Sequence, residues 1–144
     1  MSIETSNYFC RKSTQKIRGV LNYTRKVSKM LETDLEFRKG ILFIRLNGEL
    51  TKKTVSQLEE EVTKKIKKSG IQNIVFNIEK LINIDLKGIN ALFYNYELCH
   101  QNNGKSLLCG ISNPEIKVKL EKSRLLKYIS ETETELSAFD LIHI

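Results

Sequence analysis

The sequence predicts an α/β protein with a mostly parallel sheet of four to five strands and about four helices. Short apolar runs alternate along the chain with longer segments in which apolar residues recur every three or four positions, as in amphipathic helices. Several of the short runs are apolar on both faces, which is typical of strands that are covered on both sides. Strands that alternate with helices imply right-handed crossovers and therefore parallel neighbours.

Residues 1–30 differ from the rest in charge. They hold seven bases and one acid, whereas the remaining 114 residues hold 17 bases and 16 acids. We therefore divide the chain into a basic N-terminal arm, residues 1–30, and one domain, residues 31–144. The arm is either disordered or a weak amphipathic helix that lies on a membrane or a partner, and a further reading is that translation starts at Met30. Because the domain itself is nearly neutral, no nucleic-acid partner is expected.

The domain is expected to begin with two strands within Leu31–Leu50. They are joined by a turn at Lys39-Gly40, so the N-terminal strand is antiparallel to its neighbour. The second strand is apolar on both faces from Ile41 to Ile44 and is predicted to end at Gly48.

A helix is expected to follow over residues 51–70. Thr51 or Thr54 can cap its start, and Gly70 follows its lysine-rich last turn. One helical face is apolar and consists of Val55, Leu58, Val62 and Ile66. The lysines between these residues are interpreted as a solvated face.

The second half repeats the alternation. A strand is predicted over 71–81, a helix over 86–102 and a buried strand over 106–111. Pro114 begins another helix with Asn113 as its cap. A short strand within 125–130 and a last helix that starts after Thr132 or Thr134 and runs to Ile142 complete the order.

The chain lacks the residues that catalysis or metal binding would need. His100 and His143 have no second histidine, cysteine or carboxylate at ligand spacing, and no phosphate-binding glycine loop or nucleophile motif occurs. The cysteines Cys10, Cys99 and Cys109 have no CxxC spacing and read as reduced thiols of a cytoplasmic protein. No secretory signal or membrane span is visible. We expect no enzyme activity, no cofactor and no metal, and tight nucleotide binding would contradict this.

The junction between the strand and the helix near residue 85 is the most informative stretch. Asp85 can cap the helix that follows, and Gly88 in the first helical turn costs up to about 1 kcal/mol relative to alanine. A glycine there leaves the helix start bare, so that another backbone can approach closely. In open α/β sheets, ligands and partners meet the carboxyl ends of parallel strands, which is where this junction lies.

Three stretches carry a resemblance to a known family. These are Leu46-Asn47-Gly48-Glu49-Leu50 after the second strand, Asn73 to Ile78, and Leu81 to Gly88. Together with the order of elements, they resemble a STAS domain of the bacterial anti-sigma factor antagonists over about residues 31–142. In that family a segment of the type Asp-Ser-Ser/Thr-Gly opens the second helix, and its serine is phosphorylated by a partner anti-sigma kinase. The unphosphorylated antagonist binds the kinase, and the phosphorylated one releases it.

This sequence departs from the family pattern at the serine. Asp85 and Gly88 match the family's Asp and Gly, but Leu86 stands at the acceptor position and Lys87 follows it. No serine or threonine stands between Ser69 and Ser106. A phosphate would add about −1.5 to −2 charges, and leucine can carry none of that.

The resemblance implies a cytoplasmic STAS-type interaction module that regulates transcription through a sigma factor. Its partner would be an anti-sigma factor or a kinase-fold protein, bound without serine phosphorylation through the 46–51 loop and the 82–93 edge. The alternative is a STAS scaffold or an accessory subunit of a membrane transport system, whose basic arm would lie on anionic lipid. The predicted partner-binding residues are Gly48, Glu49, Leu50, Thr51, Asp85, Leu86, Lys87, Gly88 and Asn90.

Overall fold

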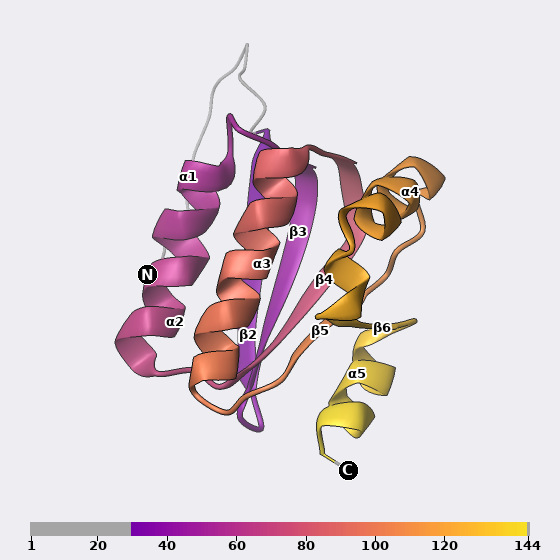
Figure 1. Cartoon of the computed structure of the whole chain (residues 1–144). Coiled ribbons are helices and arrows are strands. Elements are labelled where there is room, and N and C mark those ends of the chain that lie inside the picture. Colours follow the sequence, from indigo (N-terminus) through magenta and orange to yellow (C-terminus); the bar gives the residue numbers. More distant parts are fainter. Residues whose placement is uncertain (1–29, 144) are drawn as a thin grey trace, which may run out of the picture.

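A five-stranded mixed sheet organises the computed structural model, which describes residues 30–143 (Figure 1). The strand order is β2-β3-β4-β5-β6; β2 is antiparallel to β3, and all the other neighbours are parallel. This confirms the predicted fold class. The predictions for the basic arm and for Cys10 fall on residues 1–29, outside the described residues. The strands are β2 (Leu31–Arg38), β3 (Ile41–Leu50), β4 (Asn73–Ile84), β5 (Ser106–Cys109) and β6 (Ser130–Thr132).

The helices cover the two faces of the sheet unequally. Figure 1 shows α1, α2 and α3 lying side by side along one face, with α4 next to them and α5 apart near β6. Alternate side chains of a strand point to opposite faces. Leu42 and Ile44 pack with the first group of helices, whereas Ile41 and Phe43 pack with Ala138 of α5. The helical elements are α1 (Val55–Leu58), η3 (Glu59–Thr63), α2 (Lys64–Ser69), α3 (Leu86–Gln101), α4 (Pro114–Ser123), η4 (Leu125–Lys127) and α5 (Glu135–Ile142).

The β2–β3 hairpin turns at Lys39 and Gly40, as predicted. Both residues have positive φ, 54° and 80°, which is the backbone of a two-residue turn that matches strand twist. The following run from Ile41 to Ile44 is buried, with relative exposures of 0 to 2%. The expectation of a strand covered on both faces is therefore confirmed.

Two strands run further than the sequence predicts. β3 does not end at Gly48 but continues to Leu50, and β4 does not end at Leu81 but continues to Ile84, because the two keep pairing as far as Leu50↔Ile84. The pairing shifts register between Gly48 and Glu49. Gly48 has φ 115° there, a conformation that side chains disfavour, and this lets the strand kink without ending. The stretch 46–50 is therefore strand and not loop.

The first helix holds a turn of π-helix, η3, between α1 and α2, which the sequence did not predict. Leu58, Val62 and Ile66 still face the core. The buried Thr63 at the end of η3 donates its hydroxyl to the Oδ1 of Asn95, 2.9 Å away in α3. Asn95 in turn donates to the carbonyl of Ala91, so this buried polar pair is satisfied inside the helix layer.

The predicted helix boundaries hold with small changes. Asn113 and Thr134 cap α4 and α5 through their side chains. Thr54 precedes α1, but its hydroxyl bonds the preceding loop instead of capping the helix. Leu125–Ser130 is not one strand, since residues 125–127 form the short helix η4 and β6 begins at Ser130.

A charged network fastens α5 to its face of the sheet. Arg45 of β3 donates from Nε and Nη2 to the two carboxylate oxygens of Glu135, at 2.7 and 2.8 Å, and also contacts Glu36 and Asp34 of β2. Asn77 of β4 donates to the same carboxylate at 2.8 Å. The Arg45 bonds lower the pKa of the Glu135 carboxyl against the opposing effect of its burial. Such bidentate pairs are stronger than single ones.

Candidate functional site

The candidate site begins where β4 ends. Asp85 stands between Ile84, the last residue of β4, and Leu86, the first of α3, with extended backbone at φ −117° and ψ −176°. Its Oδ1 accepts a hydrogen bond from the backbone N–H of Gly88 at 2.9 Å. The side chain therefore caps α3, as the sequence predicted, and satisfies one of the free N–H groups at the helix start.

The second oxygen of Asp85 reaches a different segment. Oδ2 accepts from the backbone N–H of Lys52 at 2.9 Å, and the Asp85 N–H donates to the carbonyl of Leu50 at 3.3 Å. One carboxylate thus joins the loop between β3 and α1 to the start of α3. Burial raises the pKa of Asp85, but the backbone N–H donors, chiefly Gly88 and Lys52, lower that pKa by more, so the net pKa lies below its usual value.

Position 88 requires a glycine because the backbone of β3 passes close to it. A Cβ at this position would lie 2.1 Å from the carbonyl oxygen of Leu50 and 2.9 Å from Cγ1 of Ile84. The expectation that a bare helix start admits another backbone is met inside the molecule, because β3 is the segment that approaches. Gly88 is buried.

Gly48 serves a similar purpose at the neighbouring strand. A Cβ there would lie 2.3 Å from the carbonyl oxygen of Met30, which accepts the N–H of Glu49 at 2.7 Å. Gly48 therefore allows β2 to start close against the kinked end of β3.

The predicted partner-binding residues lie together around this junction, but at different depths. Leu86, Lys87 and Asn90 are exposed, and Leu86 keeps 68% of its surface accessible. Gly48, Glu49 and Asp85 are half-buried, and three residues are buried: Leu50, Thr51 and Gly88.

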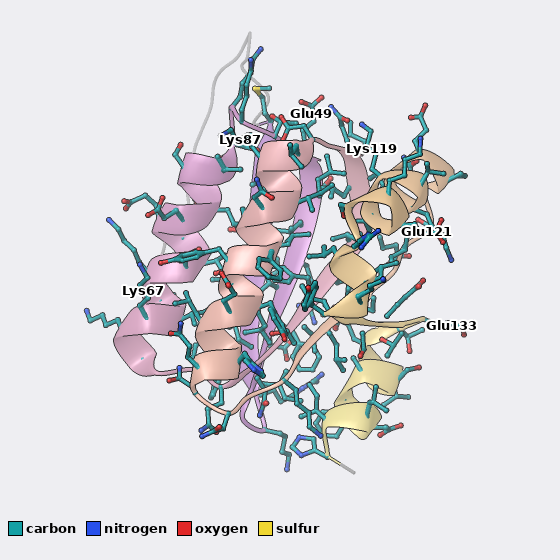
Figure 2. All side chains as sticks on the ribbon, in the orientation of Figure 1. Glu49, Lys67, Lys87, Lys119, Glu121 and Glu133 are labelled. Atoms are coloured by element: carbon teal, nitrogen blue, oxygen red, sulfur yellow. The ribbon has the colours of Figure 1, made fainter. Side chains whose placement is uncertain are left out.

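Sequence reasoning missed several residues at this end. Lys119 of α4 donates from Nζ to the carbonyl of Ile84 at 3.0 Å and to Oδ1 of Asn83 at 3.4 Å. Figure 2 shows Lys119 at the same end of the molecule as Lys87 and Glu49. Its approach joins residues 35 positions apart, and nothing local in the sequence signals it. Lys52 follows the predicted residue Thr51 in the sequence. Only the structure shows that its backbone N–H binds the carboxylate of Asp85.

The described residues contain no arrangement suited to metal binding. No three His, Cys, Asp or Glu side chains between residues 30 and 143 gather closely enough to hold an ion. His100 stacks on Tyr96 with ring centroids 5.5 Å apart, and His143 packs on Phe139 at 4.5 Å, so both rings lie against aromatic side chains. Burial raises the pKa of the Cys99 thiol to about 11, which leaves it protonated and unreactive near neutral pH.

A hollow of about 1090 Å³ lies beside β2 in the described part of the chain. It is lined largely by charged side chains, and Arg45 binds the carboxylates of Asp34 and Glu135 there. Three of its nine charged lining residues are therefore paired with one another, and we assign the hollow no ligand. No helix within residues 30–143 has the length and apolar character that crossing a bilayer requires.

Comparison with known proteins identifies similar chains. The family model described as STAS domain matches residues 32–138. An anti-sigma F factor antagonist of Paenibacillus polymyxa is 25% identical over 114 residues, which cover 79% of this chain and 97% of that protein. An anti-sigma factor antagonist structure from Mycobacterium paratuberculosis superposes with a TM-score of 0.71 at 18% identity, covering 79% of this chain and 95% of that one. The phosphorylated form of SpoIIAA, a Bacillus cell fate determinant, gives 0.61 at 23%, covering 77% and 99%.

Proposed function

Because the chain belongs to the STAS domain family, we propose that it is a cytoplasmic binding module of the anti-sigma factor antagonist kind, which works without a serine phospho-switch. Its partner is an anti-sigma factor with a kinase-type fold, and binding is its activity in place of catalysis. The interaction domain spans residues 31–144, and residues 1–30 form a separate basic arm. The P. polymyxa relative, named for its antagonism of an anti-sigma factor, supports this kind of partner.

One observation carries the proposal: Leu86 projects into solvent directly after the Asp85 cap. An exposed leucine at a helix start is a natural anchor for a protein partner, since interfaces bury apolar side chains at their centre. The surrounding geometry is intact, because Asp85 caps α3 and Gly88 lets the helix pack on β3. The backbone around Leu86 is therefore that of a capped helix start, whereas the leucine side chain has no group that could be phosphorylated.

Neighbouring hydroxyl groups do not replace the missing serine. Thr51 and Thr54 lie in the adjoining loop, but both are buried. The Thr54 hydroxyl donates to the carbonyl of Glu49 at 2.9 Å, and the Thr51 hydroxyl accepts from the N–H of Lys53 at 3.3 Å. A kinase could reach neither without opening the loop, so the module stays in its binding state.

A pair of matched variants tests the binding surface. Leu86→Asp should weaken binding to an anti-sigma factor of the same genome at least about tenfold, because it puts a charge where an apolar side chain would be desolvated. The new carboxylate lies in the first turn of α3, where it does not harm the helix. Leu136→Asp is the control: Leu136 is also an exposed leucine in a first helical turn, at 70%, but in α5. Isothermal titration calorimetry measures both.

If no anti-sigma factor of that genome binds the wild-type chain, the proposed function is wrong. If binding occurs and both aspartate variants bind like the wild type, the partner uses another surface.

The missing switch has its own test. When the complex is incubated with ATP, we expect the wild-type chain to remain unmodified and bound, as measured by intact mass and size-exclusion chromatography. Leu86→Ser should become phosphorylated and leave the complex, because a phosphate adds about two negative charges at the contact. Lys87→Ser, one residue further along the exposed segment, controls for any accessible serine. Phosphate on another residue of the wild-type chain, with release of the partner, would contradict a permanent binding state.

A further inference from the structure

Four exposed lysines lie at the end of the molecule around Leu86. Lys52 and Lys53 come from the loop before α1, Lys87 from α3 and Lys119 from α4, and all four are exposed. We call these four residues the lysine rim. It is assembled from three separate elements, so it is a product of the fold and not of one basic run.

Two contacts fix where the rim lies. The backbone of Lys52 bonds to Asp85 at 2.9 Å, and the ammonium of Lys119 bonds to the carbonyl of Ile84 at 3.0 Å. Lys52 and Lys119 of the rim therefore contact Asp85 and Ile84 from two different elements. Leu86 is the next residue in the sequence after Asp85. Lys87 is the next residue along the chain, and Figure 2 shows it and Lys119 projecting at this end.

Two acids close to the rim, Asp85 and Glu49, are less exposed than its lysines. The Asp85 carboxylate is half-buried and accepts two backbone N–H groups, and Glu49 is half-buried. A third acid, Glu32, is exposed and lies opposite Asn47 at the start of β2. The four rim lysines outnumber these three acids at the end around Leu86.

We infer that the partner presents an apolar recess bordered by carboxylates, with Leu86 entering the recess and the lysine rim facing the acids. This rests on the proposed function and adds the chemistry of the partner surface. An exposed leucine among the lysines fits a protein better than a nucleic acid, whose phosphates favour basic side chains and whose bases favour aromatic ones. Complementary charge around an apolar centre speeds association and excludes wrong partners.

The test compares charge reversal at the rim with charge reversal elsewhere. The full chain is titrated with an anti-sigma factor of the same genome at 50 and 300 mM NaCl. We expect the wild-type affinity to fall several-fold at the higher salt, because exposed charges are screened. Lys52→Glu/Lys87→Glu should bind at least about tenfold more weakly at 50 mM. Lys68→Glu, at the far end of α2 beside the labelled Lys67 (Figure 2), should stay within about twofold.

The outcomes distinguish the acidic partner surface from the proposed function. If the affinity changes neither with salt nor with charge reversal at the rim but is weakened by Leu86→Asp, the inference of an acidic partner surface is wrong and the proposed function still stands. Absence of binding by the wild-type chain would overturn both. A duplex DNA or single-stranded RNA probe that binds as tightly as the anti-sigma factor would assign the rim to nucleic acid instead. Circular dichroism spectra that match the wild type establish that the variants are folded.

Discussion

At the scale of single residues, Asp85 contributes most to the geometry of the site. Its two oxygens accept N–H groups from Gly88 and Lys52, which lie in different segments. The cap on α3 was predictable from the sequence, because aspartate before an apolar helical run is a common start signal. The bond to Lys52 was not, because it joins residues 33 positions apart.

Replacing Asp85 should reveal both roles. We expect Asp85→Ala to lower the free energy of unfolding by about 1 to 2 kcal/mol at pH 7, in the range of a lost helix cap. The pKa of Asp85 is lowered in the folded chain, so its charge stabilises the fold above the unfolded pKa of about 3.9 and this stabilisation is lost as the pH falls through the folded pKa. The gap between wild type and variant should therefore shrink below about pH 4 in urea titrations.

The matched control is Asn113→Ala. Asn113 also accepts two backbone N–H groups, those of Glu115 and Ile116, but its amide does not titrate. Its loss should cost a similar free energy at every pH. If the Asp85→Ala deficit is as pH-independent as that of Asn113→Ala, the charge of Asp85 contributes nothing.

At the scale of elements, α5 depends on a few contacts. It buries Ala138 and Ile142 against one face of the sheet, and Glu135 at its start binds Arg45 and Asn77. The sequence predicted this helix and the acidic residues at its start. The partners of Glu135 were not predictable, because strand positions give the facing direction of a side chain but not which helix will cover it.

Glu135→Gln should loosen α5 more than the rest of the fold. The variant loses a bidentate charged pair with Arg45, and we expect about 1 to 2 kcal/mol of lost stability, near the lower end of the range for hydrogen bonds to charged groups. Hydrogen exchange should show faster exchange for α5 amides than for those of β3 or α3. Asp34→Asn is the control, because Asp34 meets the same arginine at 3.2 Å but is largely exposed, and such pairs contribute little. Uniform loss of protection across all elements would contradict a local role.

The remaining differences between sequence and structure have physical causes of the same kind. The π turn in η3 brings Thr63 to Asn95, and helical periodicity alone contains no sign of it. Gly48 was interpreted as the end of a strand because glycine usually interrupts one, but here it permits a register shift within a continuing pair. Local signals thus predicted the elements, whereas contacts between distant segments decided their ends.

At the scale of the whole molecule, two hydrophobic cores lie on opposite faces of the sheet. The helices α1 to α4 and one sheet face enclose the larger core, and α5 closes a smaller one on the other face. The candidate surface lies at the end of the sheet, where β3, β4 and α3 meet, and its exposed residues Leu86, Lys87 and Asn90 belong to neither core. Asp85 and Gly88 in the sequence predicted where this surface lies. The presence of Lys119 there could not be predicted, because it depends on how α4 packs.

The bond between Asp85 and Lys52 also bears on how fast and how tightly the surface can bind. Because the loop and the helix start are already joined in the free chain, docking need not immobilise either of them. Surfaces that are ordered before contact lose less conformational entropy on association, so more of the interaction free energy appears as affinity. A rigid surface of this kind is expected to associate in a single step without prior rearrangement, with a rate governed by diffusion and charge.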